Sequence, residues 1–257
     1  MFAAPTRSAG SSRLVIHFQV FEQVNQGICS TLNKLIKLAN GKYLRIVSSD
    51  DMVIVGSTAR LMNELLQAEK YKLASFGDAI TVNAVGEKIS DSHIEFLGKE
   101  QSLYKKDVLK AIITQWAIAG PSILLRKNFE QEVGNYDENL LVEDWNMYLR
   151  LAANDKIVFC AEAVALYRVH QSNTSMTKDI KKRIQNLKSQ IRGGQANLGR
   201  LKRPYLYLLQ SEIYLLKAKV HFLESNYLRT LKYMALSWNK KIHFLIHKQE
   251  TVKNDLA

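Results

Sequence analysis

Two adjacent carboxylates interrupt the apolar run YLRIVSSDDMVIV, which covers residues 43–55. Asp50 and Asp51 follow a segment whose Val and Ile content is typical of a buried strand. Open α/β sheets bind ligands just beyond the carboxyl ends of their strands. Two carboxylates there could hold Mg²⁺ or Mn²⁺ while phosphates complete the coordination shell. Ser and Asp are also common turn residues, so the motif by itself allows either a metal site or a plain turn.

A second acidic pair, Glu143 and Asp144, lies in LLVEDWNMYLRLA, residues 140–152. Trp145, Tyr148 and Leu149 follow the i, i+3, i+4 spacing of a helix that begins at or just after this pair. Acidic residues at a helix start accept hydrogen bonds from free amides and interact favourably with the helix dipole. A carboxylate at the edge of a pocket could instead act as a general base, worth about 10²- to 10⁴-fold in rate.

A third motif, YRVHQSNTS (167–175), places Arg168 and His170 in alternation at the end of a predicted strand. A lone histidine is more often a hydrogen-bonded structural residue than a ligand. The function of His170 therefore depends on which other motifs accompany it.

The motifs occur in an order that resembles one enzyme family. VNQGICSTLN (24–33), GKYLRIVSSDD (41–51), GPSILLRKNFEQEVGNYDENLLVEDWNMYLRLA (120–152) and YRVHQSNTS together are similar to a family 2 glycosyltransferase with the GT-A fold. The resemblance covers about residues 20–175. It implies transfer of a sugar from a nucleotide-diphosphate sugar to a glycan or lipid-linked acceptor, as in polysaccharide biosynthesis, with Mg²⁺ or Mn²⁺ as cofactor.

The resemblance also assigns roles to individual residues. In such enzymes one acid deprotonates the acceptor hydroxyl, and the sugar is displaced with inversion and without a covalent enzyme intermediate. A divalent cation stabilises the charge that develops on the leaving diphosphate. The resemblance implies that Asp144 and Glu143 are catalytic and that Asp51 and His170 are metal ligands. It implies that the donor is bound by Asn25, Gly27, Asn33 and Asp50. It places Gly120, Ser122 and Trp145 on the acceptor side.

The sequence departs from the family pattern at three points. Ser48 replaces an aspartate of the acidic motif, and Leu32 replaces an arginine that contacts the nucleotide. The opening strand, helix and strand that hold the base and ribose are also missing, so we expect an amino-terminally truncated member with impaired donor binding. This expectation leaves the activity of the chain open, and the alternative is a non-catalytic binding or membrane-surface protein built on the same half-fold.

The elements that must position these residues follow from the hydrophobic pattern. Strands are predicted over 14–21 and 43–47, a helix over 30–40, and a helix from 57 to 68 that Ser57 caps. Residues 72–90 predict a hairpin that turns near Gly86. The alternation predicts an α/β fold with a mixed, mostly parallel sheet. We assign residues 1–19 to a leader and the first remaining strand, and 20–175 to a partial GT-A domain.

Residues 176–257 form a basic helical region. They contain 17 Lys and Arg against 5 Asp and Glu, which accounts for the whole net charge of +12. Two apolar series, Tyr205 to Leu223 and Tyr227 to Trp238, predict an amphipathic helical hairpin that turns at Ser225 and Asn226. This region either lies on an anionic membrane surface or packs on the domain with a solvated basic face. No nucleic-acid-binding module is recognisable.

Composition limits the remaining classes. Hydrophobic residues make up 47% of the 257 residues and charged residues 23%, typical of a globular protein. Cys29 and Cys160 cannot form a disulfide framework and belong to no zinc motif. No uninterrupted apolar stretch reaches the roughly 18 residues of a membrane span. We therefore predict a cytoplasmic protein, with the inner face of the membrane as the place of any peripheral contact.

Overall fold

The computed structural model describes residues 19–170, 173 and 177–254, with the side chains after residue 249 excluded. Most of the strand predicted over 14–21 lies outside the described residues. Residues 19–27 are irregular, and the first described helix, α1 (Ile28–Leu38), confirms the helix predicted over 30–40.

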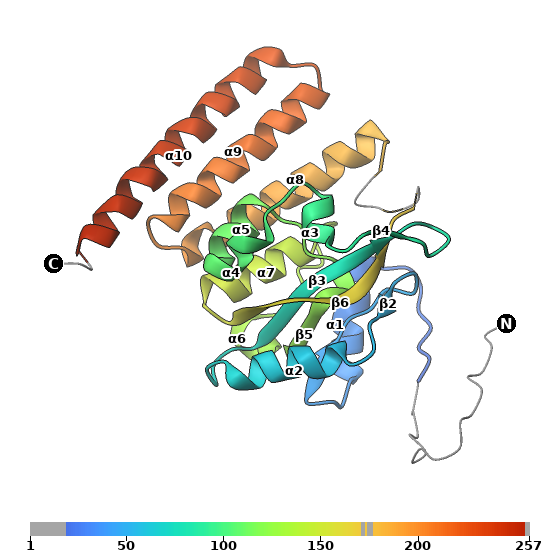
Figure 1. Ribbon diagram of the computed structural model, residues 1–257. Helices are drawn as coiled ribbons and strands as arrows, with labels where there is room; N and C mark the ends of the chain where they lie inside the picture. The colour runs from blue at the N-terminus through green and yellow to red at the C-terminus, as the bar shows by residue number, and fades with distance from the viewer. Residues whose placement is uncertain (1–18, 171–172, 174–176, 255–257) are drawn as a thin grey trace, which may run out of the picture.

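A curved six-stranded sheet forms the centre of the molecule (Figure 1). Its strands follow the order β1-β5-β3-β6-β2, with β4 paired to β3. Only the β3–β6 pair is parallel among the described strands, so the prediction of a mostly parallel sheet is wrong while the mixed α/β class is confirmed. The hairpin predicted over residues 72–90 accounts for the antiparallel pair β3–β4, because a tight turn joins only antiparallel strands. The antiparallel pairs β1–β5, β3–β5 and β2–β6 were not anticipated. The strands are β1 (Tyr43–Arg45), β2 (Met52–Val53), β3 (Ala74–Val82), β4 (Lys88–Ser90), β5 (Ile123–Arg126) and β6 (Ile157–Arg168).

Helices cover both faces of the sheet. α2 (Ser57–Gln67) packs on one face, and its inward residues Leu61 and Leu65 are fully buried. Ser57 is the first helical residue rather than the cap; Gly56, at φ 77°, precedes it. On the other face lie α3 (His93–Phe96), α4 (Gln101–Lys106), α5 (Val108–Thr114) and α7 (Asp144–Ala153). The short elements η1 (Gly120–Ser122) and α6 (Phe129–Val133) flank β5.

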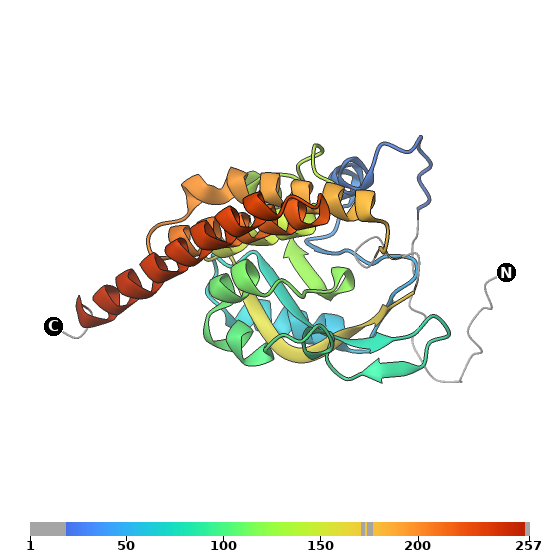
Figure 2. The ribbon, with the colours of Figure 1, turned by 90° about the horizontal axis from the view of Figure 1, so that it is seen from above.

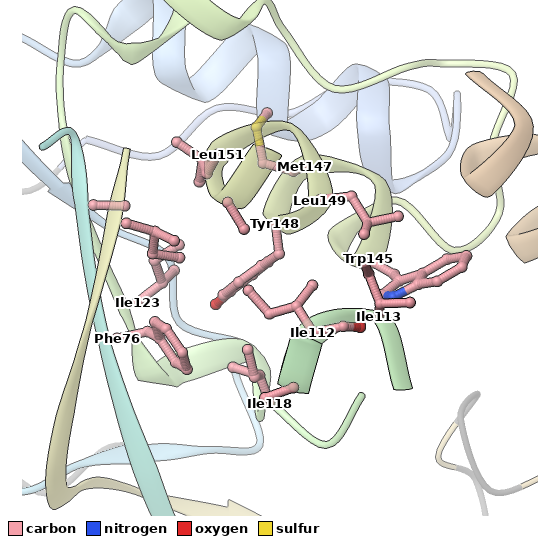
Figure 3. Close-up of a cluster of buried hydrophobic side chains, with 14 of the residues drawn as sticks. Phe76, Ile112, Ile113, Ile118, Ile123, Trp145, Met147, Tyr148, Leu149 and Leu151 are labelled. Atoms are coloured by element: carbon pink, nitrogen blue, oxygen red, sulfur yellow. Dashed lines mark hydrogen bonds between the residues drawn. The ribbon is translucent and has the colours of Figure 1, made fainter. Parts of the chain in front are cut away.

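The main core lies between the sheet and α7 (Figure 3). Phe76 of β3 meets Tyr148 of α7 edge-to-face, with ring centroids 5.7 Å apart. The indole Nε1 of Trp145 donates a hydrogen bond to the carbonyl oxygen of Ile112 in α5 at 2.8 Å. All residues of α7 from Trp145 to Ala152 are buried, so packing holds the helix immediately after its first residue, Asp144.

Three long helices complete the fold. The predicted hairpin is confirmed as α9 (Tyr205–Leu223) and α10 (Tyr227–Asn254), with the turn at residues 224–226. α8 (Ile180–Asn197) was not predicted as a separate helix, and it contains two adjacent glycines, residues that disfavour a helix interior. A Cβ at Gly194 would lie 3.0 Å from Ile213 Cγ1 and 3.2 Å from the Trp145 ring, so the absence of a side chain allows α8 to pack closely on α7 and α9.

The three helices form a layer beside the sheet domain, and α10 is its outermost member (Figure 2). Within the described ranges, no helix has the combination of length and apolarity that crossing a bilayer requires.

Candidate functional site

The first acidic pair meets the third motif at the end of β6. Antiparallel pairing of β2 with β6 sets Met52 opposite Leu166, which places the preceding turn beside residues 168–170. His170 Nε2 lies 2.9 Å from Asp50 Oδ2, and the Arg168 amide donates to Asp51 Oδ1 at 2.9 Å. We call Asp50, Asp51, Arg168 and His170 the β6-end cluster. Residues about 120 positions apart in sequence are thus brought into direct contact.

The two carboxyl groups of this cluster have opposite pKa shifts. The hydrogen bond from His170 lowers the pKa of Asp50. Burial raises the pKa of Asp51 to about 6, even though the Arg168 amide opposes this shift. A buried carboxyl with a raised pKa becomes easier to ionise when a cation lies beside it. Asp51 is therefore the carboxyl group of this cluster whose charge burial disfavours.

The donor set of the β6-end cluster fits a divalent cation in part. Carboxylate oxygens and an imidazole nitrogen suit Mn²⁺, and carboxylate oxygens suit Mg²⁺. No group of three or more His, Cys, Asp or Glu in the described part of the chain is arranged to hold a metal by itself. An ion held by Asp51, with His170 or Asp50, would need further oxygen ligands. Phosphates commonly supply such ligands to Mg²⁺.

Arg168 organises the cluster, a role that the sequence did not indicate. Its Nε donates to the carbonyl oxygen of Asp50 at 2.9 Å. Its Nη1 donates to the carbonyl oxygens of Asn83 and Ala84, in the β3–β4 turn, at 3.2 and 3.0 Å. The guanidinium thus connects the acidic turn to the neighbouring hairpin. The alternation of Arg168 with His170 was the only feature that could have revealed it.

The second acidic pair lies at the start of α7, as predicted. Asp144 is the first residue of the helix, and its Oδ1 accepts a hydrogen bond from the Trp145 amide at 2.7 Å. The Glu143 side chain makes no capping hydrogen bond. Asp144 therefore accepts a hydrogen bond from a free amide at the helix start, as expected, whereas Glu143 does not.

Both carboxyl groups of this pair are difficult to ionise. Burial and the neighbouring charge of Asp144 raise the pKa of Glu143. Burial also raises the pKa of Asp144, and the hydrogen bond from the Trp145 amide opposes that shift. A carboxylate whose pKa is raised toward neutral pH is a stronger base than an exposed aspartate. This environment suits proton abstraction.

Asp144 lines a cavity of about 770 Å³ between the sheet domain and the three long helices. Gly120, Trp116 and Ile118 contribute from the loop before β5. Apolar side chains dominate the far wall, which is built by α8, α9 and the start of α10. These wall residues are Leu187, Leu215, Ala218, Phe222, Leu223 and Met234. The basic helical region therefore forms part of the candidate site.

Three basic side chains in this lining were missed by sequence reasoning. They are His93, Arg183 and Lys219. Burial lowers the pKa of His93 to about 4, so its ring is neutral at pH 7, and its Nδ1 lies 3.1 Å from Thr81 Oγ1. None of the three belongs to a recognisable motif, and only the assembled fold places them beside Asp144.

The predicted acceptor-side residues separate into two groups. Gly120 lines the cavity, whereas Ser122 and Trp145 are 0% and 3% exposed and lie behind its wall. Contact of Ser122 and Trp145 with an acceptor is therefore not supported, and their positions indicate support of the wall. Arg45 adds to this support, because its Nη2 donates to the carbonyl oxygens of Pro121 at 3.3 Å and Val164 at 2.7 Å.

The predicted donor-binding residues of the first motif lie near α1 and make internal contacts. Asn25 Oδ1 accepts from the amide of Gly27, which has φ 88° and precedes the helix. Asn33 accepts from the Tyr136 amide at 3.0 Å and donates to the Tyr136 carbonyl oxygen at 3.0 Å. It also donates to Glu138 Oε1 at 2.9 Å. Asn33 thus braces the loop that leads to Glu143 and Asp144.

The model of the glycosyltransferase-like family 2 matches residues 9–222. No curated protein matches significantly. Among solved structures, a similar one is the mannosyltransferase PcManGT from Pyrobaculum calidifontis in complex with GDP-Man and Mn²⁺, with 14% identity and a TM-score of 0.49. The similarity covers 84% of this chain but 55% of the mannosyltransferase chain, so this chain spans about half the length of that enzyme.

Proposed function

Because the chain belongs to the glycosyltransferase-like family 2, we propose that it transfers a sugar from a nucleotide-diphosphate sugar to a hydroxyl group of a glycan or lipid-linked acceptor. One observation carries this proposal. Asp144 lies in the wall of a large cavity, at the start of a buried helix, with its pKa raised by burial. That position and that basicity suit a residue that removes the proton of an acceptor hydroxyl.

Asp144 is the proposed base of a direct displacement with inversion. Its Oδ1 is oriented by the Trp145 amide, and α7 cannot shift easily because its residues from Trp145 onward are buried. Deprotonation of the acceptor would let its oxygen form a bond to the anomeric carbon as the bond to the diphosphate breaks. The neutral His93 ring and the cationic Arg183 and Lys219 would contact polar groups of the bound acceptor.

The β6-end cluster is the proposed site for the diphosphate of the donor. Asp51, with His170, would hold Mg²⁺ or Mn²⁺, and Asp50 would keep the imidazole in place through their 2.9 Å hydrogen bond. The cation would supply Lewis-acid stabilisation of the negative charge on the departing diphosphate. Arg168 holds the cluster through its bond to the Asp50 carbonyl oxygen.

The proposal is tested by incubating the purified chain with a panel of uridine- and guanosine-diphosphate sugars and Mn²⁺, in the presence of glycan and lipid-linked acceptors. Release of nucleoside diphosphate measures turnover, and NMR of the product determines the anomeric configuration. Isothermal calorimetry with the two nucleoside diphosphates and Mn²⁺ measures donor binding separately. We expect turnover with an inverted anomeric centre.

The double variant Asp51→Ala, Asp144→Ala removes one acid from each pair and is expected to lose both binding and turnover. Asp91→Asn is the matched control, because Asp91 is an exposed surface acid that pairs only with Lys88 in the described contacts. Unchanged binding and turnover in the double variant would refute the assigned roles.

A non-catalytic binding protein on the same fold is the competing function. It predicts donor or acceptor binding without release of nucleoside diphosphate under any combination in the panel. Binding with no turnover, unaltered by Asp144→Ala, would favour that function.

A further inference from the structure

The outer face of α10 carries a continuous apolar stripe. Its exposed fractions range from 44% for Ile242 to 72% for Trp238. At 3.6 residues per turn, the stripe occupies an arc of about 80° and extends for about 27 Å along the helix. Single exposed apolar residues are normal, but a contiguous band of this size marks an interaction surface. The stripe consists of Tyr227, Leu231, Met234, Trp238, Ile242 and Leu245.

Basic side chains accompany the stripe. Lys232 and Lys241 of α10 are exposed and lie on opposite sides of the stripe, and Lys181 and Lys182 at the start of α8 are exposed as well. α10 contains six Lys and Arg and a single acidic residue. The whole excess of positive charge of the chain lies after residue 176, so the partner of this face should be anionic as well as apolar. A second copy of the chain would instead bring two strongly basic regions together.

The stripe continues into the cavity that contains Asp144. Met234 belongs to the stripe and lines the cavity, and Phe222 at the end of α9, 59% exposed, also lines it. Figures 1 and 2 show α10 as the outermost helix, so its outer face is open to a large flat partner. A surface that covered the stripe would therefore border the mouth of the cavity.

We propose that α10 lies along an anionic phospholipid surface, with its apolar stripe inserted among the headgroups and the flanking Lys232 and Lys241 side chains on phosphates. Amphipathic helices with Trp and Leu on one face and Lys and Arg beside it bind membranes in this orientation. The binding itself does not depend on the transfer reaction. The consequence that a lipid-linked acceptor enters the cavity from the bilayer rests on the proposed function.

Vesicle flotation of the full chain tests the proposal. We expect binding to vesicles of phosphatidylcholine with 30% phosphatidylglycerol at low salt, weaker binding at 0.5 M salt, and none to pure phosphatidylcholine. At about 1 kcal/mol per surface cation, replacing Lys232 and Lys241 with Gln should lower the partition coefficient roughly 30-fold. Because Trp238 is highly exposed, its fluorescence should shift to the blue on binding, and Trp238→Phe should remove that shift while binding is retained.

The stripe is tested by the triple variant Leu231→Gln, Trp238→Gln, Leu245→Gln, whose side chains are all exposed. Its matched control replaces three exposed apolar residues of the sheet domain, Val55, Leu66 and Val85, with Gln. The stripe variant should lose vesicle binding and keep its circular dichroism spectrum, while the control binds like the wild type.

Three outcomes would overturn the proposal. They are an absence of wild-type binding to anionic vesicles, equal binding of the stripe variant, and a dimer in light scattering that the stripe variant abolishes. The last would assign the face to a second copy. Turnover on a water-soluble acceptor, measured without vesicles, should be the same in the stripe variant, so failure of membrane binding is distinguishable from failure of the transferase proposal.

Discussion

The two acidic pairs have similar sequences and differ in the groups that contact them. Asp50 and Asp51 contact the His170 ring and the Arg168 amide, and the hydrogen bond from His170 lowers the pKa of Asp50. Glu143 and Asp144 make no ion pair among the described residues, and burial raises both pKa values. His170 stabilises the charge of Asp50, and the Arg168 amide partly offsets the burial that raises the pKa of Asp51 to about 6. In the second pair, burial disfavours the charge of both carboxyl groups. Adjacent carboxylates thus suit cation binding in one setting and proton abstraction in the other.

The largest expected effect comes from Asp144→Asn. Loss of a general base should lower the rate of transfer by about 10²- to 10⁴-fold, because an amide cannot accept the acceptor proton. Donor affinity should change little, since Asp144 does not contact the β6-end cluster. Steady-state kinetics and calorimetry of the same preparation separate the two effects. A variant that lost donor affinity and kept its rate would reverse the roles of the two pairs.

Asp51→Asn should have the complementary effect. Removing one carboxylate charge should weaken Mn²⁺-dependent binding of a nucleoside diphosphate on the order of 10-fold or more, the scale of losses around metal ligands. Calorimetry with and without Mn²⁺ measures this loss. The Asp144→Asn protein is the control and should bind normally. An equal loss in both variants would mean that the two pairs are not functionally distinct.

Glu143→Gln should stabilise the protein at high pH. The pKa of Glu143 is raised in the folded state, so its contribution to stability is fully present below the ordinary pKa near 4.5 and is lost as pH rises through the folded value. Replacing the acid should therefore raise the free energy of unfolding by on the order of 1–2 kcal/mol at pH 8. The difference should vanish near pH 4.5. Urea unfolding at both pH values checks this, and destabilisation at pH 8 would contradict it.

Asp50→Asn should show the opposite pH dependence and the smallest effect. The pKa of Asp50 is lowered, so its contribution is present above the ordinary value of 3.8 and is lost as pH falls below it. Its side chain is 40% exposed, which limits the loss at pH 7 to under about 1 kcal/mol. Urea unfolding at pH 7 and pH 3.5 measures the contribution. A larger loss at the lower pH would exclude the assigned sign.

Local patterns were sufficient for much of the fold. The spacing of Trp145, Tyr148 and Leu149 located the start of α7, and Gly86 located the turn between β3 and β4. These two features depend on short stretches of sequence, where spacing and turn chemistry determine the outcome. The proximity of Asp50 to His170, 120 positions away, was implied by the resemblance to the enzyme family and not by a local pattern.

Features that depend on contacts between distant segments could not be predicted from local patterns. The direction of strand pairing was wrong because it depends on the path of the chain between strands. The cavity wall was missed because His93, Arg183 and Lys219 come from three separate helices. Which residues line the cavity depends on tertiary packing, and no single motif indicates it.

The helical hairpin shows the same limit within one motif. In α9 the periodic residues Leu209, Ile213 and Leu216 are buried, whereas Leu231 and Trp238 in α10 are exposed despite equivalent spacing. Apolar periodicity predicts that a helix has an apolar face, but it does not say what covers that face.

The two glycines of α8, Gly193 and Gly194, are positions at which a substitution would change the size of the cavity. They set the distance between α8 and α7, and the same helix presents Arg183, Leu187 and other lining residues one to three turns away. A methyl group added at Gly193 would lie 3.3 Å from Asn146 Cβ and would force the two helices slightly apart. Engineering of this family member toward bulkier acceptors therefore has a natural starting point at residue 193, outside the catalytic groups themselves.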